Sequence, residues 1–231
     1  MSAVSNLFSN LFRNPQEKNS DYRPEVDGLR AIAVLSVIFY HLDPNFLPGG
    51  YVGVDIFFVI SGYLITSHLL TEIVDRNSFS FKKFYGRRIR RILPALLGVI
   101  IFSLIMGFSF LTSYYFKNLG SESFYALLST SNIYFYLNSG YFDLDSSMRP
   151  LLHTWSLGVE EQFYLVWPIL LLVIYKLFRS RVHIIILLVL LCVSSFVANG
   201  LFQHDPSGIF YLMPFRIFEL SIGGMIAWLH G

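Results

Sequence analysis

Several ionisable residues of this 231-residue chain lie within or beside long apolar stretches. An ionisable side chain inside a membrane is costly, and it marks a candidate functional position. The set consists of Arg30, His41, Asp55, His68, Glu72, Glu160, Glu161, Arg216 and Glu219. Histidine is the side chain that changes charge near neutral pH, so His41 is the first candidate for a general base.

Arg30 and His41 stand eleven residues apart, which corresponds to three helical turns plus about 20°. They therefore share one helix face, with a rise of about 16 Å between them. Asp27 falls near the same face. Spacing alone favours a plainer interpretation, in which the histidine is interfacial and the arginine snorkels to the membrane surface.

A short connection rich in proline and glycine, residues 43–50, follows His41 and leads to Asp55. This connection should return the chain close to the histidine. The Asp55 carboxylate could then accept a hydrogen bond from the imidazole and fix its tautomer, as the acid of a catalytic dyad does. The alternative is a carboxylate in interfacial water. Gly53 and Gly62 are expected to permit close helix packing rather than to line a ligand site.

A run of four arginines precedes Pro94 and the third apolar segment: Arg87, Arg88, Arg90 and Arg91. As a bare pattern such a run is a topogenic signal, because basic residues stay on the cytoplasmic side of a membrane. The functional interpretation is a phosphate grip, since several guanidinium groups near a helix start can hold phosphoryl oxygens bidentately.

The stretch 153–164 is the most polar sequence that enters an apolar segment, and it holds Glu160 beside Glu161. Adjacent residues point to different sides of a helix, so only one of these carboxylates can face a shared interior. Arg216 and Glu219 stand three residues apart in another apolar segment. That spacing predicts an ion pair on one helix face.

Composition places these residues in a membrane protein. The chain is 54% apolar, 17% aromatic and 14% charged, with a mean hydropathy of +0.55, whereas soluble domains carry about 25% charged residues. This excludes a soluble enzyme, a disordered tail and a nucleic-acid-binding module. The net charge of +2 is too small to imply an anionic polymer as partner. The single cysteine, Cys192, excludes a disulfide framework and a thiolate metal site.

Seven apolar segments are expected to be helical, which predicts an all-α polytopic membrane bundle. They are residues 29–42, 51–74, 92–113, 120–137, 154–175, 182–199 and 209–229. Residues 1–28 are polar and lack the apolar core of a signal peptide, so we expect a cytoplasmic N-terminal segment.

Lysine and arginine set the expected orientation. Residues 1–30, 75–91 and 176–181 together hold 14 of the 17 lysines and arginines, and all three regions are expected to be cytoplasmic. Segment 120–137 then lies between an outward and an inward span and cannot cross. Its serine, threonine and asparagine content agrees with this. We expect about six spans plus a re-entrant or interfacial segment at 120–137.

Together these pieces resemble acyltransferase family 3, a family of bacterial membrane-bound O-acetyltransferases that act on cell-surface glycans. The matching stretches follow the family order, and they are residues 22–34 with His41, 57–62, 84–94, 155–164 and 214–223. Residues 139–143 and 149–155 most resemble the subgroup that carries an additional C-terminal SGNH-type hydrolase domain.

The resemblance implies acetyl-CoA, or another acyl-CoA, as a cytosolic donor. It implies a hydroxyl of a cell-envelope glycan or lipid-linked glycan as acceptor, such as O-antigen, peptidoglycan or exopolysaccharide. It also implies a multi-pass protein in the bacterial inner membrane, in contact with membrane lipids and with no nucleic-acid partner. The family domain has more spans than are visible here, so residues 29–231 are expected to be its N-terminal portion.

The resemblance also assigns residues. His41 and the arginines of the first and third helices match functional positions of the family, and Glu160 matches its acidic position. The expected catalytic set is His41, Asp55 and Glu160, and the expected donor-binding set is Arg30, Arg88 and Arg91, with no metal. His41 would act as a base or as a nucleophile. Two other classes stay open: a proton-coupled transporter or lipid-carrier component, and a non-catalytic interaction subunit.

Overall fold

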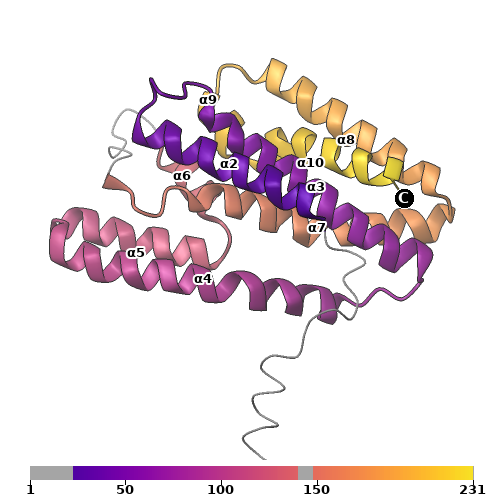
Figure 1. The fold of residues 1–231 in the computed structure, drawn as a ribbon, viewed down its shortest axis with the longest axis horizontal. Coiled ribbons are helices and arrows are strands. Elements are labelled where there is room, and N and C mark those ends of the chain that lie inside the picture. The colour runs from indigo at the N-terminus through magenta and orange to yellow at the C-terminus, as the bar shows by residue number, and fades with distance from the viewer. Residues whose placement is uncertain (1–22, 140–147, 231) are drawn as a thin grey trace, which may run out of the picture.

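The computed structural model describes residues 23–139 and 148–230, and within these ranges the chain forms helices joined by turns and loops (Figure 1). The all-α class is confirmed. The elements are α2 (Pro24–Leu42), the 3-10 turn η1 (Gly50–Val52), α3 (Gly53–Leu69), its π-helical continuation η2 (Leu70–Asp75), α4 (Phe81–Phe110), α5 (Ser113–Leu127), α6 (Ser131–Leu137), α7 (Thr154–Phe178), α8 (Arg181–Leu201), α9 (Pro206–Tyr211) and α10 (Met213–His230).

Five helical stretches of the described chain are long and apolar enough to cross a membrane, which supports a multi-pass architecture. They are Gly50–Asp75, Phe81–Phe110, Thr154–Phe178, Arg181–Leu201 and Pro206–His230. The expected first span, α2, is not among them, because its first two turns hold Glu25, Asp27 and Arg30. Crossing by α2 stays a prediction.

Glycines bring α3 against α10 and α2 against α3. A methyl group added to Gly62 would lie 1.9 Å from the backbone oxygen of Leu220, and Gly223 of α10 is equally tight against α3. On the other side of α3, a methyl group on Gly53 would lie 2.4 Å from the backbone oxygen of Ala33. Close backbone approach is a main source of helix association in lipid. The packing role predicted for Gly53 and Gly62 is confirmed.

α7 and α8 complete the bundle around α3 and α10 (Figure 1). Phe58, Trp167 and Leu188 are fully buried in its core. The indole nitrogen of Trp167 donates a hydrogen bond of 2.9 Å to the hydroxyl of Thr66, so these two buried side chains pair with each other. The outer faces of α4 and α8 expose large apolar side chains, as helices in contact with lipid do.

The single segment expected at 120–137 is instead two helices, α5 and α6. They are separated by a break at Ser129, whose φ of 56° is left-handed and ends a right-handed helix. α5 runs back along α4, and α6 packs on α7 (Figure 1). The side-chain amide of Gln162 on α7 donates a 2.8 Å hydrogen bond to Asn132, so the polar residues that argued against a span hold α6 in place.

α4 begins at Phe81 rather than at residue 92, so the arginine run lies inside the helix. The helix N-terminus therefore does not contribute to a phosphate grip, contrary to expectation. Thirty residues give a length of about 45 Å, against a hydrocarbon core of about 30 Å. α4 is thus long enough for its arginine-bearing turns to extend beyond the hydrocarbon. Asp75 at the end of η2 pairs with Arg181 at the start of α8, so two predicted basic regions share one end of the bundle.

The prediction that residues 1–28 are cytoplasmic falls mostly on residues 1–22, which lie outside the described residues. Most of the 139–143 stretch also lies outside them. The orientation of the bundle in the membrane stays a prediction.

The α3–α10 contact can be tested by filling it. Gly223→Ala should lower the free energy of unfolding by about 1–3 kcal/mol, because the added methyl group has no room against the backbone of α3. Gly98→Ala is the matched control, because nothing lies within 4 Å of the methyl group it adds. Thermal unfolding in detergent measures both variants, and an equal effect would contradict this packing.

Candidate functional site

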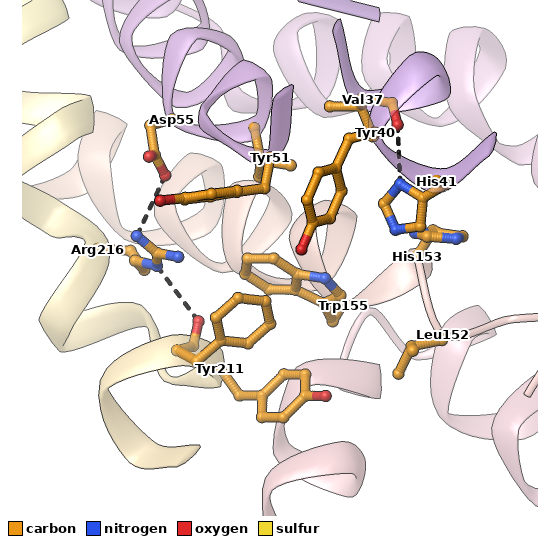
Figure 2. Close-up of a pocket in the computed structure, with 12 residues that line it drawn as sticks. Val37, Tyr40, His41, Tyr51, Asp55, Leu152, His153, Trp155, Tyr211 and Arg216 are labelled. Atoms are coloured by element: carbon orange, nitrogen blue, oxygen red, sulfur yellow. Dashed lines mark hydrogen bonds and ion pairs between the residues drawn. The ribbon is translucent and has the colours of Figure 1, made fainter. Parts of the chain in front are cut away.

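A cavity of about 460 Å³ lies where α2, η1, α3 and α7 meet the α9–α10 region (Figure 2). We call it the histidine cavity. Its lining residues are Val37, Tyr40, His41, Tyr51, Val54, Asp55, Leu152, His153, Trp155, Phe210, Tyr211 and Arg216. The structure therefore brings His41 and Asp55 into one cavity, as the short connection between their segments predicted.

The tautomer of His41 follows from one hydrogen bond. Its Nδ1 lies 2.8 Å from the backbone oxygen of Val37, one turn earlier on α2 (Figure 2). A carbonyl oxygen only accepts, so Nδ1 carries the hydrogen and the neutral ring keeps its lone pair on Nε2. The orienting role expected of Asp55 is therefore wrong, because the group that accepts from His41 belongs to α2 itself.

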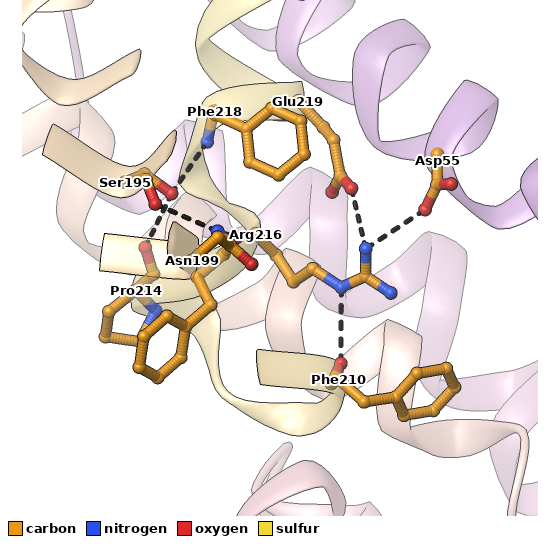
Figure 3. A network of polar contacts seen from close by, with 9 residues as sticks. Asp55, Ser195, Asn199, Phe210, Pro214, Arg216, Phe218 and Glu219 are labelled. Atoms are coloured by element: carbon orange, nitrogen blue, oxygen red, sulfur yellow. Dashed lines mark hydrogen bonds and ion pairs between the residues drawn. The ribbon is translucent and has the colours of Figure 1, made fainter. Parts of the chain in front are cut away.

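Asp55 instead pairs with Arg216. Nη1 of the guanidinium lies 3.2 Å from the Asp55 carboxylate and 2.7 Å from that of Glu219 (Figure 3). Nε donates to the backbone oxygen of Phe210 at 3.2 Å, and the ring of Trp155 lies 5.6 Å from the guanidinium carbon. The predicted pair of Arg216 with Glu219 is confirmed. Nη2 has no hydrogen-bond partner among the described residues, which leaves it available at the cavity wall.

The first turn of α10 positions Arg216, and α8 supports that turn (Figure 3). The hydroxyl of Ser195 donates to the backbone oxygen of Pro214 at 2.7 Å and accepts from the N–H of Phe218 at 3.2 Å. The side-chain amide of Asn199 donates to the backbone oxygen of Phe215 at 2.7 Å. These side-chain bonds fix the first turn of α10 against α8.

His153 is a site residue that the sequence analysis did not single out. Its ring centroid lies 4.7 Å from that of His41, and the two rings are nearly perpendicular at 85°. Burial, and then the nearby His41, lower the pKa of His153. Simultaneous positive charge on His41 and His153 is therefore disfavoured. No sequence signal links two histidines 112 residues apart, although His153 does open the polar stretch that was noted.

A second cavity of about 330 Å³ continues from the histidine cavity toward Glu160, and we call it the glutamate cavity. The two cavities share the residues Val37, Val54, His153 and Trp155. The hydroxyl of Tyr164 donates to Glu160 at 3.1 Å, and the guanidinium of Arg88 stacks 3.9 Å above the Tyr164 ring. Glu160 thus stands between the histidine cavity and the arginines of α4.

A third cavity of about 330 Å³ lies between α3 and α4, and we call it the arginine cavity. Its lining residues are Leu64, Ile65, His68, Phe84, Arg87, Arg88 and Arg91. Arg88 and Arg91, predicted to bind a phosphorylated donor, therefore share one cavity. Arg30 does not join them, because its guanidinium lies 3.4 Å from Asp27 and lines none of the three cavities.

Glu122 of α5 supports the segment that leads to His153. Its side chain is buried, with 1% of its surface exposed, and it accepts a hydrogen bond from the backbone of Leu151. Burial raises the pKa of Glu122 to about 7, although the positive charge of Arg149 opposes the shift. The loop that carries His153 is thus fixed to α5 by a carboxyl that remains largely protonated below neutral pH.

Comparison with known protein families identifies the family to which this chain belongs. A family model described as an acyltransferase domain matches residues 23–230, which is nearly all of the described chain. The chain belongs to this acyltransferase family. The match covers the helices that form all three cavities, so the histidine and arginine cavities are features of an acyltransferase domain.

Curated relatives agree with this family. The chain is 42% identical over 211 residues to the Bacillus subtilis protein named "Putative peptidoglycan O-acetyltransferase YrhL", covering 89% of this chain and 33% of that protein. It is 39% identical over 211 residues to peptidoglycan O-acetyltransferase OatA of Listeria monocytogenes, covering 90% and 34%. The chain thus spans about a third of the length of these relatives.

A Haemophilus influenzae protein named only as uncharacterized is 43% identical over 183 residues. That match covers 76% of this chain and 74% of the relative. No solved structure matches the chain.

Glu122 makes stability depend on pH in a defined direction. Between about pH 4.5 and 7 the folded protein keeps the Glu122 proton that the unfolded chain has lost, so this group makes stability fall as pH rises, with no further change above that range. Glu122→Gln should remove this part of the pH dependence. Thermal unfolding at pH 5 and pH 8 measures it, with exposed Glu25→Gln as control. An unchanged pH dependence in Glu122→Gln would contradict the assignment.

Proposed function

We propose that this chain forms the part of a membrane O-acetyltransferase that binds the acyl donor and holds the general base. The reaction moves an acetyl group from acetyl-CoA to a hydroxyl of a cell-envelope glycan. One observation carries the proposal: His41, with an available Nε2, lines a cavity that continues through the glutamate cavity toward the arginine cavity, and α3 lines all three. The names of two relatives support peptidoglycan as the acceptor.

The arginine cavity is the proposed site for the phosphates of the donor. Arg88 and Arg91 offer guanidinium groups that bind phosphoryl oxygens bidentately. From Leu64 in this cavity to Val54 in the histidine cavity the rise along α3 is about 15 Å. An extended pantetheine arm is long and thin enough to cover such a distance, and the mostly apolar glutamate cavity lies on the way.

His41 is the proposed general base. The acceptor hydroxyl oxygen attacks the thioester carbonyl while Nε2 of His41 takes the hydroxyl proton. The tetrahedral intermediate then collapses, the carbon–sulfur bond breaks, and the imidazolium returns the proton to the departing thiolate. The other route, in which Nε2 attacks the thioester and forms an acyl-histidine, uses the same geometry.

Arg216 supplies positive charge at the wall of the histidine cavity, where negative charge would develop on the carbonyl oxygen. Asp55 and Glu219 hold the guanidinium in position, so Asp55 acts through Arg216 rather than through His41. Glu160 completes the adjacent cavity, and its proposed role is to contact the acceptor or the donor arm. The donor-binding role expected of Arg30 is not retained, since Arg30 lies beside Asp27.

The proposed orientation places the arginine cavity at the cytosolic face of the bacterial inner membrane. This follows the asymmetry of the basic residues, of which those at 75–91 and 176–181 gather at one end of the bundle. The histidine cavity then lies toward the outer face. A cytosolic donor and an external glycan would approach the site from opposite sides.

Replacing the base tests the proposed chemistry. His41→Ala should lower acetyl transfer to peptidoglycan by at least about 100-fold, because a positioned general base contributes at least that much. Binding of acetyl-CoA should be unchanged. His204→Ala, a change at an exposed histidine outside the three cavities, is the control. Radiolabelled acetyl-CoA with membranes and peptidoglycan measures transfer, and full transfer by His41→Ala would refute the role of base.

The phosphate grip is tested against its topogenic alternative. Arg91→Gln should weaken acetyl-CoA binding by about tenfold, because charge-assisted hydrogen bonds to phosphate are lost. Lys82→Gln removes the same charge from the exposed first turn of α4, outside the arginine cavity. Calorimetry on detergent-purified protein gives both affinities. If Lys82→Gln weakens binding equally, the arginine run acts only through its charge on the membrane side.

A further inference from the structure

A fourth cavity, of about 250 Å³, lies beside the arginine cavity, and we call it the Arg76 cavity. It is formed by the start of α2, one face of α3 and the end of η2, through residues that include Arg23, Tyr63, Ser67, Thr71, Glu72 and Arg76. The Arg76 cavity and the arginine cavity share Leu64 and His68. The two cavities are therefore adjacent along α3.

Arg23 is held in this cavity before any ligand arrives. Its guanidinium lies 5.4 Å from the centre of the Tyr63 ring and donates a hydrogen bond to the Tyr63 hydroxyl. Tyr63 itself is fixed in the α3–α10 packing, with only 9% of its surface exposed. A cation positioned in this way loses little conformational freedom when it binds an anion.

The charges in the Arg76 cavity do not cancel. Its one carboxylate, Glu72, is already engaged by Arg87 of α4 at 3.0 Å and by His68 at 3.2 Å. Arg23 and Arg76 thus remain as surplus positive charge. Within residues 23–139 and 148–230 no hydrogen bond or ion pair engages the Arg76 side chain, and the Ser67 hydroxyl lines the same cavity. Two guanidinium groups and a hydroxyl form a binding set for a phosphate monoester, which carries up to two negative charges.

We infer that the Arg76 cavity binds the 3′-phosphate of the acyl-CoA donor, an inference that rests on the proposed function. The direction of the molecule supports this assignment. The pantetheine arm would leave the pyrophosphate in the arginine cavity toward His41, so the adenosine end must leave it the opposite way. Thr71 and Arg76 lie farther from Asp55 along α3 and η2 than any α3 residue of the arginine cavity. The site therefore distinguishes coenzyme A from its analogue without this phosphate.

The test compares coenzyme A with 3′-dephospho-coenzyme A. The 231-residue chain, purified into phosphatidylcholine nanodiscs, should bind coenzyme A about tenfold more tightly than the dephospho form. Arg76→Gln should remove this preference by weakening coenzyme A binding about tenfold, with dephospho-coenzyme A binding unchanged. Arg91→Gln should weaken both. Arg179→Gln, an exposed arginine outside all four cavities, should change neither affinity.

A second variant keeps the inference testable if Arg76→Gln folds poorly. Tyr63→Phe keeps the ring in the α3–α10 packing and removes the hydroxyl that holds Arg23. It should lower the preference for coenzyme A several-fold and leave dephospho-coenzyme A binding unchanged. A merely structural effect would weaken both ligands together.

The outcomes separate this subsite from the proposed function. Equal binding of the two ligands by the unaltered chain, or equal losses in Arg76→Gln, would overturn the 3′-phosphate subsite and leave the donor assignment intact. Binding of neither ligand would overturn both. If Arg76→Gln keeps the coenzyme A preference but no longer retains phosphatidylglycerol added to the nanodiscs, the cavity holds a lipid headgroup and the inference is wrong.

Discussion

Arg216 places a permanent positive charge inside a bundle built to face lipid, and such a charge must be compensated within the protein. Its partners come from different elements: Asp55 from α3, Glu219 from α10 and the backbone oxygen of Phe210 from α9. The glycine contact between α3 and α10 makes this possible, because it brings the two backbones close enough for short carboxylates to reach the guanidinium. Helix packing and the charged wall of the histidine cavity therefore depend on each other.

α3 and its continuation η2 are the structural centre of the site. Residues of this one span line all four cavities, from Val54 at one end to Glu72 at the other. The span is also the most buried of the five helical stretches that could cross the membrane. The four cavities follow one another along its length. Such an arrangement suits an extended molecule whose reactive group and charged end lie far apart.

The sequence predicted what depends on local spacing. Hydrophobic stretches gave the helices, the three-residue spacing gave the pair of Arg216 with Glu219, and the short connection gave the common location of His41 and Asp55. Contacts between distant segments were missed, such as the pair of Asp55 with Arg216. The start of α4 was also misplaced, because a run of charged residues reads as a loop although lysine and arginine are good helix formers. Composition could not separate α5 from α6, since the break depends on the backbone of Ser129.

The hydrogen bond from His41 to Val37 has a wider consequence. Donor and acceptor belong to the same turn of α2, so the helix backbone alone selects which ring nitrogen carries the hydrogen. No side chain elsewhere has to be kept for that purpose. The walls of the cavity could therefore change without altering which ring nitrogen of His41 carries the hydrogen. The state of the histidine ring and the shape of the cavity around it are thus set by separate parts of the chain.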